Sequence, residues 1–160
     1  MAERPPLPAR SPLTIPVEEG PVAVWVDRVV AGIVFGFAAT WVVMLLRIDP
    51  DARGHGTHEQ LGWEPCGWPA VYGMPCPTCG CTTAACHLLH GNVVQAFVVQ
   101  PFGAAVALGG ALLGVHALLC LLRGRSFVDV MVRLPFWRIV FGATLLLLLA
   151  WWYKCAVWPQ

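Results

Sequence analysis

The chain has 160 residues, of which 58% are hydrophobic and 12% are charged, and its mean hydropathy is +0.67. Because a soluble domain usually has about a quarter of its residues charged, this composition excludes an ordinary soluble protein and indicates a membrane protein. The formal net charge of +1 provides no basic field to attract nucleic acid, so we expect no nucleic-acid partner.

The amino-terminal stretch, residues 1–21, is rich in proline and lacks an apolar core. Prolines stand at positions 5, 6, 8, 12 and 16. Such a segment cannot bury enough apolar surface to fold, so we predict a disordered tail. A secretory signal would have a shorter apolar segment nearer the start, which favours a retained anchor as the first apolar stretch. Residues 22–160 are then expected to form one membrane domain.

Three stretches are long and apolar enough to cross a hydrocarbon core, which requires about 20 helical residues. The predicted spans cover about 22–46, 98–122 and 139–157. The first has no charge between Arg28 and Arg47, and the third carries only Lys154 near its end. The sequence therefore predicts an all-α membrane protein with three transmembrane helices.

The distribution of basic residues predicts the orientation of these spans. Seven lie on the side of the amino terminus and the second loop, namely Arg4, Arg10, Arg28, Arg123, Arg125, Arg133 and Arg138. Three lie on the other side, namely Arg47, Arg53 and Lys154. Since basic residues concentrate on the cytoplasmic side, we expect a cytoplasmic amino terminus. The loop 48–92 then faces outward.

Five of the seven cysteines lie in this outer loop, at Cys66, Cys76, Cys79, Cys81 and Cys86. Outside the cytoplasm cysteines tend to form disulfides. An odd number leaves at least one thiol that stays free, binds a ligand or pairs between chains. Cys120 and Cys155 fall within the predicted spans, where we expect them to act as small apolar groups.

The stretch "PCPTCGCTTAACHLLHG" predicts a short helix that is re-entrant or lies at the membrane interface. Gly80 allows a tight bend, after which a helix begins at Cys81 or Thr82. Gly91 is a typical residue just past a helix end. Asn92, with Gln95 three residues later, has the spacing of a capping box, which predicts a second short helix. That helix reaches Gln100-Pro101, where the proline should bend or restart it before the second span.

These residues carry a resemblance to a known family. The relevant positions are Cys66, Cys76, Pro77, Cys79, Gly80, Thr82 and Ala84, followed by Gly91-Asn92 and Gln100-Pro101. Over about 66–122 the chain resembles the bacterial membrane family catalogued as domain of unknown function 2752, whose motif is CPxCGxTRA. The resemblance implies no established reaction. The chain departs from the motif at Thr83, where the family has an arginine.

Two hypotheses assign a chemical function to the cysteine motif, namely thiol-disulfide redox chemistry and zinc binding. The spacing of Cys76 and Cys79 is found in thiol-disulfide oxidoreductases. A helix beginning just after Cys79 and Cys81 would lower the thiol pKa values of these two residues. However, no thioredoxin-like alternation of strands and helices surrounds the pair. The second hypothesis is a zinc site, because Cys86 and His90 share one face of the short helix and could join Cys76 and Cys79 as four ligands.

The third hypothesis is structural and is the one we favour. A disulfide between Cys66 and Cys76 would close a short loop and stabilise it by about 2 to 3 kcal/mol, although Cys76 with Cys79 is a rival pairing. The chain is then a non-enzymatic accessory or assembly component that needs no cofactor. Its expected partners are membrane lipids and other membrane-protein subunits. His55 and His58, in a polar glycine-rich stretch, are expected to be solvated loop residues.

Small residues in the predicted spans indicate close helix packing. Gly32 and Gly36 in the first span, and Gly110 and Gly114 in the second, each stand four residues apart. This spacing lets the backbones of two membrane helices approach each other. We therefore expect these glycines to lie at helix-helix contacts.

Overall fold

A computed structural model describes residues 21–158 of the chain. The predicted tail falls, apart from its last residue, outside the described residues. The elements are α1 (Pro21–Leu45), a 3-10 helix η1 (Thr57–Leu61), α2 (Trp68–Tyr72), α3 (Cys81–Leu89), α4 (Val93–Val99), α5 (Pro101–Arg123), α6 (Phe127–Arg133) and α7 (Phe136–Ala156). Residues 21–158 contain no strand, which confirms the predicted all-α class.

Three helices in the described part of the chain are long and apolar enough to span a membrane. They cover Val24–Leu45, Pro101–Arg123 and Phe136–Ala156, which confirms the three predicted spans. The second begins at Pro101 rather than at 98 because the backbone of Gln100 is extended. The third begins three residues earlier than predicted, directly after Pro135. An integral membrane protein follows from these three helices.

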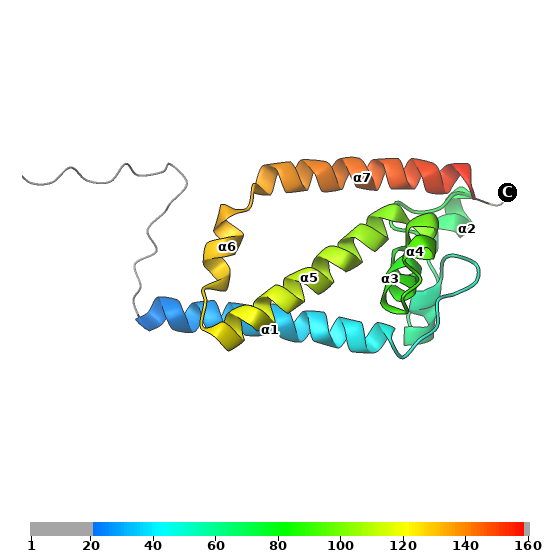
Figure 1. The fold of residues 1–160 in the computed structure, drawn as a ribbon. Coiled ribbons are helices and arrows are strands. Elements are labelled where there is room, and N and C mark those ends of the chain that lie inside the picture. The colour runs from blue at the N-terminus through cyan, green and yellow to red at the C-terminus, as the bar shows by residue number, and fades with distance from the viewer. Residues whose placement is uncertain (1–20, 159–160) are drawn as a thin grey trace, which may run out of the picture.

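The second span lies obliquely between the other two. Figure 1 shows α5 running diagonally from the end of α4 toward the start of α1, with α7 on its other side. α5 packs against both α1 and α7, whereas α1 and α7, as described, do not contact each other. The bundle is therefore organised around α5.

Only one of the four predicted packing glycines lies at a helix contact. A Cβ added at Gly114 would lie 2.6 Å from the Cβ of Ala38, so α5 approaches α1 closely at this point. At Gly32, Gly36 and Gly110 an added Cβ would meet nothing within 4 Å. The prediction was wrong for these three because spacing along a helix does not determine which face meets a neighbour.

The two short helices α3 and α4 pack together on the starting turns of α5. Their shared core consists of Ala84, Ala96, Val99 and Ala104. Gly91 ends the first helix with φ +82°, as predicted from its position. Asn92 is the N-cap of α4 but makes no side-chain capping bond, so the predicted capping box was wrong.

Gln100 instead provides a side-chain cap in this region, at the junction of α4 and α5. Its Oε1 accepts a hydrogen bond from the backbone N–H of Gly103 at 2.8 Å. Its Nε2 donates to the carbonyl of Pro77 at 3.4 Å. The fully buried Gln100 side chain thereby caps the second span and holds the cysteine motif at the same time.

At the opposite end of the bundle, α6 is attached to α1 by one carboxylate. Asp27 accepts hydrogen bonds from the Ser126 hydroxyl at 2.9 Å and from the backbone N–H groups of Phe127 and Val128 at 3.2 and 2.7 Å. These N–H groups have no partner within their own helix, because they belong to its first turn. Asp27 thus fixes the second loop to the first span.

Candidate functional site

The outer end of the bundle contains a cleft of about 450 Å³ between two segments of the loop 48–92. We call it the cysteine cleft. One wall is the cysteine motif, represented by Cys66, Cys76, Cys79, Gly80, Thr82 and Thr83. The other wall is the polar stretch that contains Arg53, His55, His58 and Glu59. The structure therefore gathers five of the seven motif positions, namely Cys66, Cys76, Cys79, Gly80 and Thr82, around one cavity.

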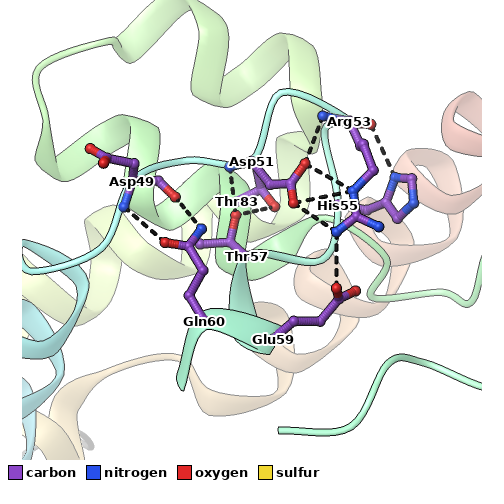
Figure 2. Close-up of polar contacts among 8 residues, drawn as sticks. All are labelled: Asp49, Asp51, Arg53, His55, Thr57, Glu59, Gln60 and Thr83. Carbon is purple, nitrogen blue, oxygen red and sulfur yellow. Dashed lines mark hydrogen bonds and ion pairs between the residues drawn. The ribbon is translucent and has the colours of Figure 1, made fainter. Parts of the chain in front are cut away.

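Ion pairs and hydrogen bonds stiffen the polar wall, as Figure 2 shows. The guanidinium of Arg53 contacts Asp51 at 2.7 Å and Glu59 at 2.9 Å. Hydrogen bonds from Arg53 lower the pKa of the Asp51 carboxyl below its usual range. The side chain of Gln60 bonds the backbone N–H and carbonyl of Asp49 at 3.3 and 2.7 Å. A segment that composition alone assigns to a solvated loop thus has a defined shape.

Two buried threonines join the polar wall to the motif (Figure 2). Thr57 donates a hydrogen bond to the hydroxyl of Thr83 at 2.8 Å and accepts one from the backbone N–H of Asp51 at 2.9 Å. Both threonine side chains are fully buried. Thr83 stands where the resembled family has an arginine. In this chain the position makes a hydroxyl contact between the two walls and carries no charge.

The turn at Gly80 brings the two walls into contact and requires glycine. Its φ of +88° is a left-handed conformation that side chains with a Cβ rarely adopt. A Cβ at this position would lie 2.6 Å from the carbonyl oxygen of Gly54. Gly54 also has a positive φ, of +71°. The motif glycine therefore allows a close backbone approach between segments 26 residues apart, in addition to starting α3.

Side chains of the third span hold the cleft in place by bonding backbone carbonyls. Trp151 Nε1 donates to the carbonyl of Pro75 at 2.9 Å, directly before the motif. The ammonium of Lys154 donates to the carbonyls of Gly54 at 3.1 Å and Val99 at 3.3 Å. The Lys154 side chain is buried, with 7% exposed. One lysine therefore ties the polar wall to the end of α4.

The break between α4 and α5 explains why such donors are needed. Pro101 has no N–H, so the last carbonyls of α4 cannot all find partners in a continuing helix. The ammonium of Lys154 donates a hydrogen bond to the carbonyl of Val99, and the hydroxyl of Tyr153 donates one to the carbonyl of Val98 at 2.9 Å. An unsatisfied carbonyl in an apolar surrounding is costly. The third span thus satisfies the backbone that the proline leaves open.

The thiols of the cleft differ in exposure. All seven cysteines of the chain carry free thiols in the structure. Within the cleft, Cys66 is exposed, Cys76 is half-buried and Cys79 is buried.

The pKa values of two thiols near the start of α3 are raised. Burial is the main cause that raises the pKa of the Cys79 thiol to about 11, and the neighbouring Cys76 is the second cause. Burial likewise raises the pKa of Cys81 to about 12. The expected lowering of these pKa values was wrong, because loss of water around the thiolate outweighs the effect of the helix terminus.

The four predicted zinc ligands fall into two separate pairs. Cys76 and Cys79 line the cleft, whereas the Cys86 thiol donates to the carbonyls of Leu45 at 3.5 Å and Ile48 at 3.2 Å. His90 Nδ1 lies 3.6 Å from the Cys86 sulfur. Across residues 21–158, no three cysteine, histidine or acidic side chains gather in an arrangement that could hold a metal ion.

Sequence reasoning missed the contribution of the polar stretch. His55 and His58, predicted to be solvated, both line the cleft opposite the cysteines. The ring of His55 lies 4.8 Å from that of Trp158, and the ring of His58 lies 6.4 Å from that of Trp63. The only local signal was the density of glycine and ionisable residues in "DARGHGTHEQ". No feature of the local sequence predicts that this stretch lies opposite the cysteine motif.

The wall that contains the cysteines coincides with a known family segment. Residues 66–114 match the family described as protein of unknown function, DUF2752. This match confirms the resemblance inferred from the motif, and it includes α2, α3, α4 and the first part of α5. No curated protein and no solved structure gives a significant match to the chain. The polar wall, at 53–59, lies outside the matched residues.

Proposed function

We propose that the chain is a non-enzymatic accessory or assembly component of a bacterial inner membrane, and that it presents the cysteine cleft to a partner subunit outside the cytoplasm. The observation that carries this proposal is the attachment of the cleft to the third span. Trp151 and Lys154 bond backbone carbonyls on both sides of the cleft at 2.9 and 3.1 Å. A cleft held this way is preorganised, so a partner need not order it on binding.

The cysteines fit a structural use in this proposal. Cys66 and Cys76 line the same cleft, and a disulfide between them would close the segment that carries α2. Cross-linking a loop of this length stabilises it by about 2 to 3 kcal/mol. The raised pKa of Cys79, about 11, disfavours the thiolate that redox catalysis needs at neutral pH. The outward orientation rests on the excess of arginine on the opposite side.

Site-specific photo-cross-linking tests the assembly role. A photoreactive amino acid at Trp63, which lines the cleft and is 53% exposed, should yield one discrete adduct with another membrane protein. The matched control is the same amino acid at Leu145, an exposed position near the middle of α7. An adduct common to both positions, or none at Trp63, would contradict a partner at the cleft.

The cysteine role is tested separately by peptide mapping of the protein under non-reducing conditions. We expect a Cys66–Cys76 disulfide, and we expect replacing both residues with serine to lower stability in detergent by about 2 to 5 kcal/mol. Cys155→Ser is the control, because this half-buried thiol lies outside the cleft. Equal losses on replacing Cys76, Cys79, Cys86 or His90, with stoichiometric zinc in the native protein, would replace the disulfide by a zinc site.

A further inference from the structure

An exposed apolar segment follows the first cysteine of the cleft. It comprises residues 67–74, "GWPAVYGM", and we call it the α2 segment. Val71 is 73% exposed, Tyr72 61% and Trp68 39%, and α2 contains no buried residue. The segment contains no charged residue. Two aromatic rings and a valine facing outward in water would be unfavourable, so this surface needs a partner.

The contact between Pro75 and Trp151 fixes the height of this segment relative to the third span. The carbonyl of Pro75, the residue that follows the segment, accepts the hydrogen bond from Trp151 at 2.9 Å. Trp151 lies five residues before the end of α7 at Ala156, which is about 7.5 Å along a helix. Figure 1 shows α2 beside this end of α7. The segment therefore lies level with the last turns of the third span.

The length of α7 places these last turns at the edge of the bilayer. Its 21 residues extend about 32 Å, close to the thickness of a hydrocarbon core of about 30 Å. A helix of this length leaves its two ends at the two membrane-water interfaces. The α2 segment accordingly lies in the layer where lipid headgroups meet acyl chains.

We infer that the α2 segment is an interfacial anchor that inserts its aromatic side chains into the lipid surface on the cleft side of the membrane. Trp68 and Tyr72 stand one helical turn apart, with ring centroids 4.7 Å apart. Rings of this kind combine an apolar body with a polar tip and concentrate at membrane interfaces. The segment has no basic residue, so the attraction arises from apolar contact and does not depend on anionic lipids.

Anchoring of this segment also acts on the cleft. Pro69 and Ala70, on the same short helix, line the cleft beside the cysteines. Gly73, with φ +66°, ends the helix and turns the chain back to the buried Pro75. Lipid contact therefore positions one wall of the cleft, while Trp151 fixes the residue that follows it.

Depth-dependent fluorescence quenching in proteoliposomes tests this inference with the full chain. An environment-sensitive fluorescent amino acid replaces Val71, and the vesicles contain phosphatidylcholine brominated either near the headgroup or near the acyl end. Aqueous iodide serves as the quencher from the water side. We expect strong quenching at position 71 by the shallow bromines and weak quenching by iodide.

Two matched positions calibrate the measurement. The probe at Glu64, an exposed charged position outside the segment, should respond to iodide. The probe at Leu145, 48% exposed near the middle of α7, should respond to the deep bromines. Replacing Trp68 and Tyr72 with serine should reduce the shallow quenching at position 71. Iodide quenching at position 71 equal to that at Glu64 would overturn the inference, and so would protection from all three quenchers, which would indicate a protein cover.

Discussion

At the scale of single residues, Thr83 shows how one substitution changes the chemistry of the motif. The resembled family has an arginine at this position, whereas here a fully buried threonine accepts a hydrogen bond from Thr57 at 2.8 Å. The guanidinium that lines this cleft comes instead from Arg53, on the opposite wall, where two carboxylates pair with it. In this chain the motif position therefore couples the two walls, and the charge lies outside the family segment.

The raised pKa of Cys79 predicts that stability falls at alkaline pH. In the folded protein this thiol ionises at about pH 11, whereas in the unfolded chain it ionises near its usual value of about 8.5. Above that lower value the unfolded state loses a proton that the folded state keeps. The stability contributed by the neutral thiol is therefore full below about pH 8.5 and is lost as pH rises to about 11, by roughly 3 kcal/mol.

Thermal unfolding in detergent between pH 7 and 10.5 measures this loss. The Cys79→Ala variant should show a smaller decline than the unsubstituted chain, because the group that titrates has been removed. Cys155→Ser is the control, since this half-buried thiol lies outside the cleft and its replacement should leave the decline as it is. Parallel declines in the unsubstituted chain and the Cys79→Ala variant would show that burial of the Cys79 thiol does not cause the loss of stability at alkaline pH.

At the scale of the elements, glycine positions decide how closely the helices approach. The start of α3 lies directly against α5, because a Cβ added at Gly103 would stand 2.5 Å from the Cα of Cys81. Farther along α5, Gly114 makes the corresponding contact with Ala38 of α1. These two contacts fix α5 against both the cysteine motif and the first span. The oblique path of α5 in Figure 1 follows from them.

Replacing Gly103 with alanine should destabilise the protein by about 1 to 3 kcal/mol, because the added methyl group has no space beside backbone atoms. The measurement is thermal unfolding in detergent. Gly110→Ala, on the same helix with nothing within 4 Å, is the matched control. It should have no effect or a slightly stabilising one, since alanine forms helices better than glycine. Equal losses for both variants would show that helix propensity, and not the contact with Cys81, is responsible.

At the scale of the whole molecule, the two ends of the bundle are built differently. One end carries the cysteine cleft and the bonds from Trp151 and Lys154. The other end is held by Asp27 and carries most of the arginines. The excess of basic residues predicts that the Asp27 end faces the cytoplasm. The cleft would then lie in an oxidising compartment, where a disulfide is stable.

Labelling with a membrane-impermeant thiol reagent in spheroplasts tests this orientation. Glu64→Cys introduces an exposed site at the cleft end, and Arg125→Cys introduces one at the Asp27 end. The unsubstituted chain gives the background from native thiols. We expect the reagent to reach position 64 and not position 125. The reverse pattern would place the cleft in the reducing cytosol, where zinc becomes the better explanation of the cysteine motif.

Local chemistry was enough to predict the three spans and the breaks between the short helices. A membrane span is determined by the apolar character of about 20 consecutive residues, and this can be read from the sequence without knowing any contact. Gly91 and Pro101 act on their own backbone, so the helix boundaries they set were also predictable. The family segment was recognised for the same reason, because its motif is contiguous.

The cleft was decided by the tertiary structure alone. Its contacts join residues far apart in sequence, with 26 positions between Thr57 and Thr83, 76 between Pro75 and Trp151, and 100 between Gly54 and Lys154. The high pKa of Cys79 has the same origin, because burial depends on which segments pack around a thiol. Composition and local spacing determine which helices form, whereas side-chain contacts across the bundle determine which of their groups meet.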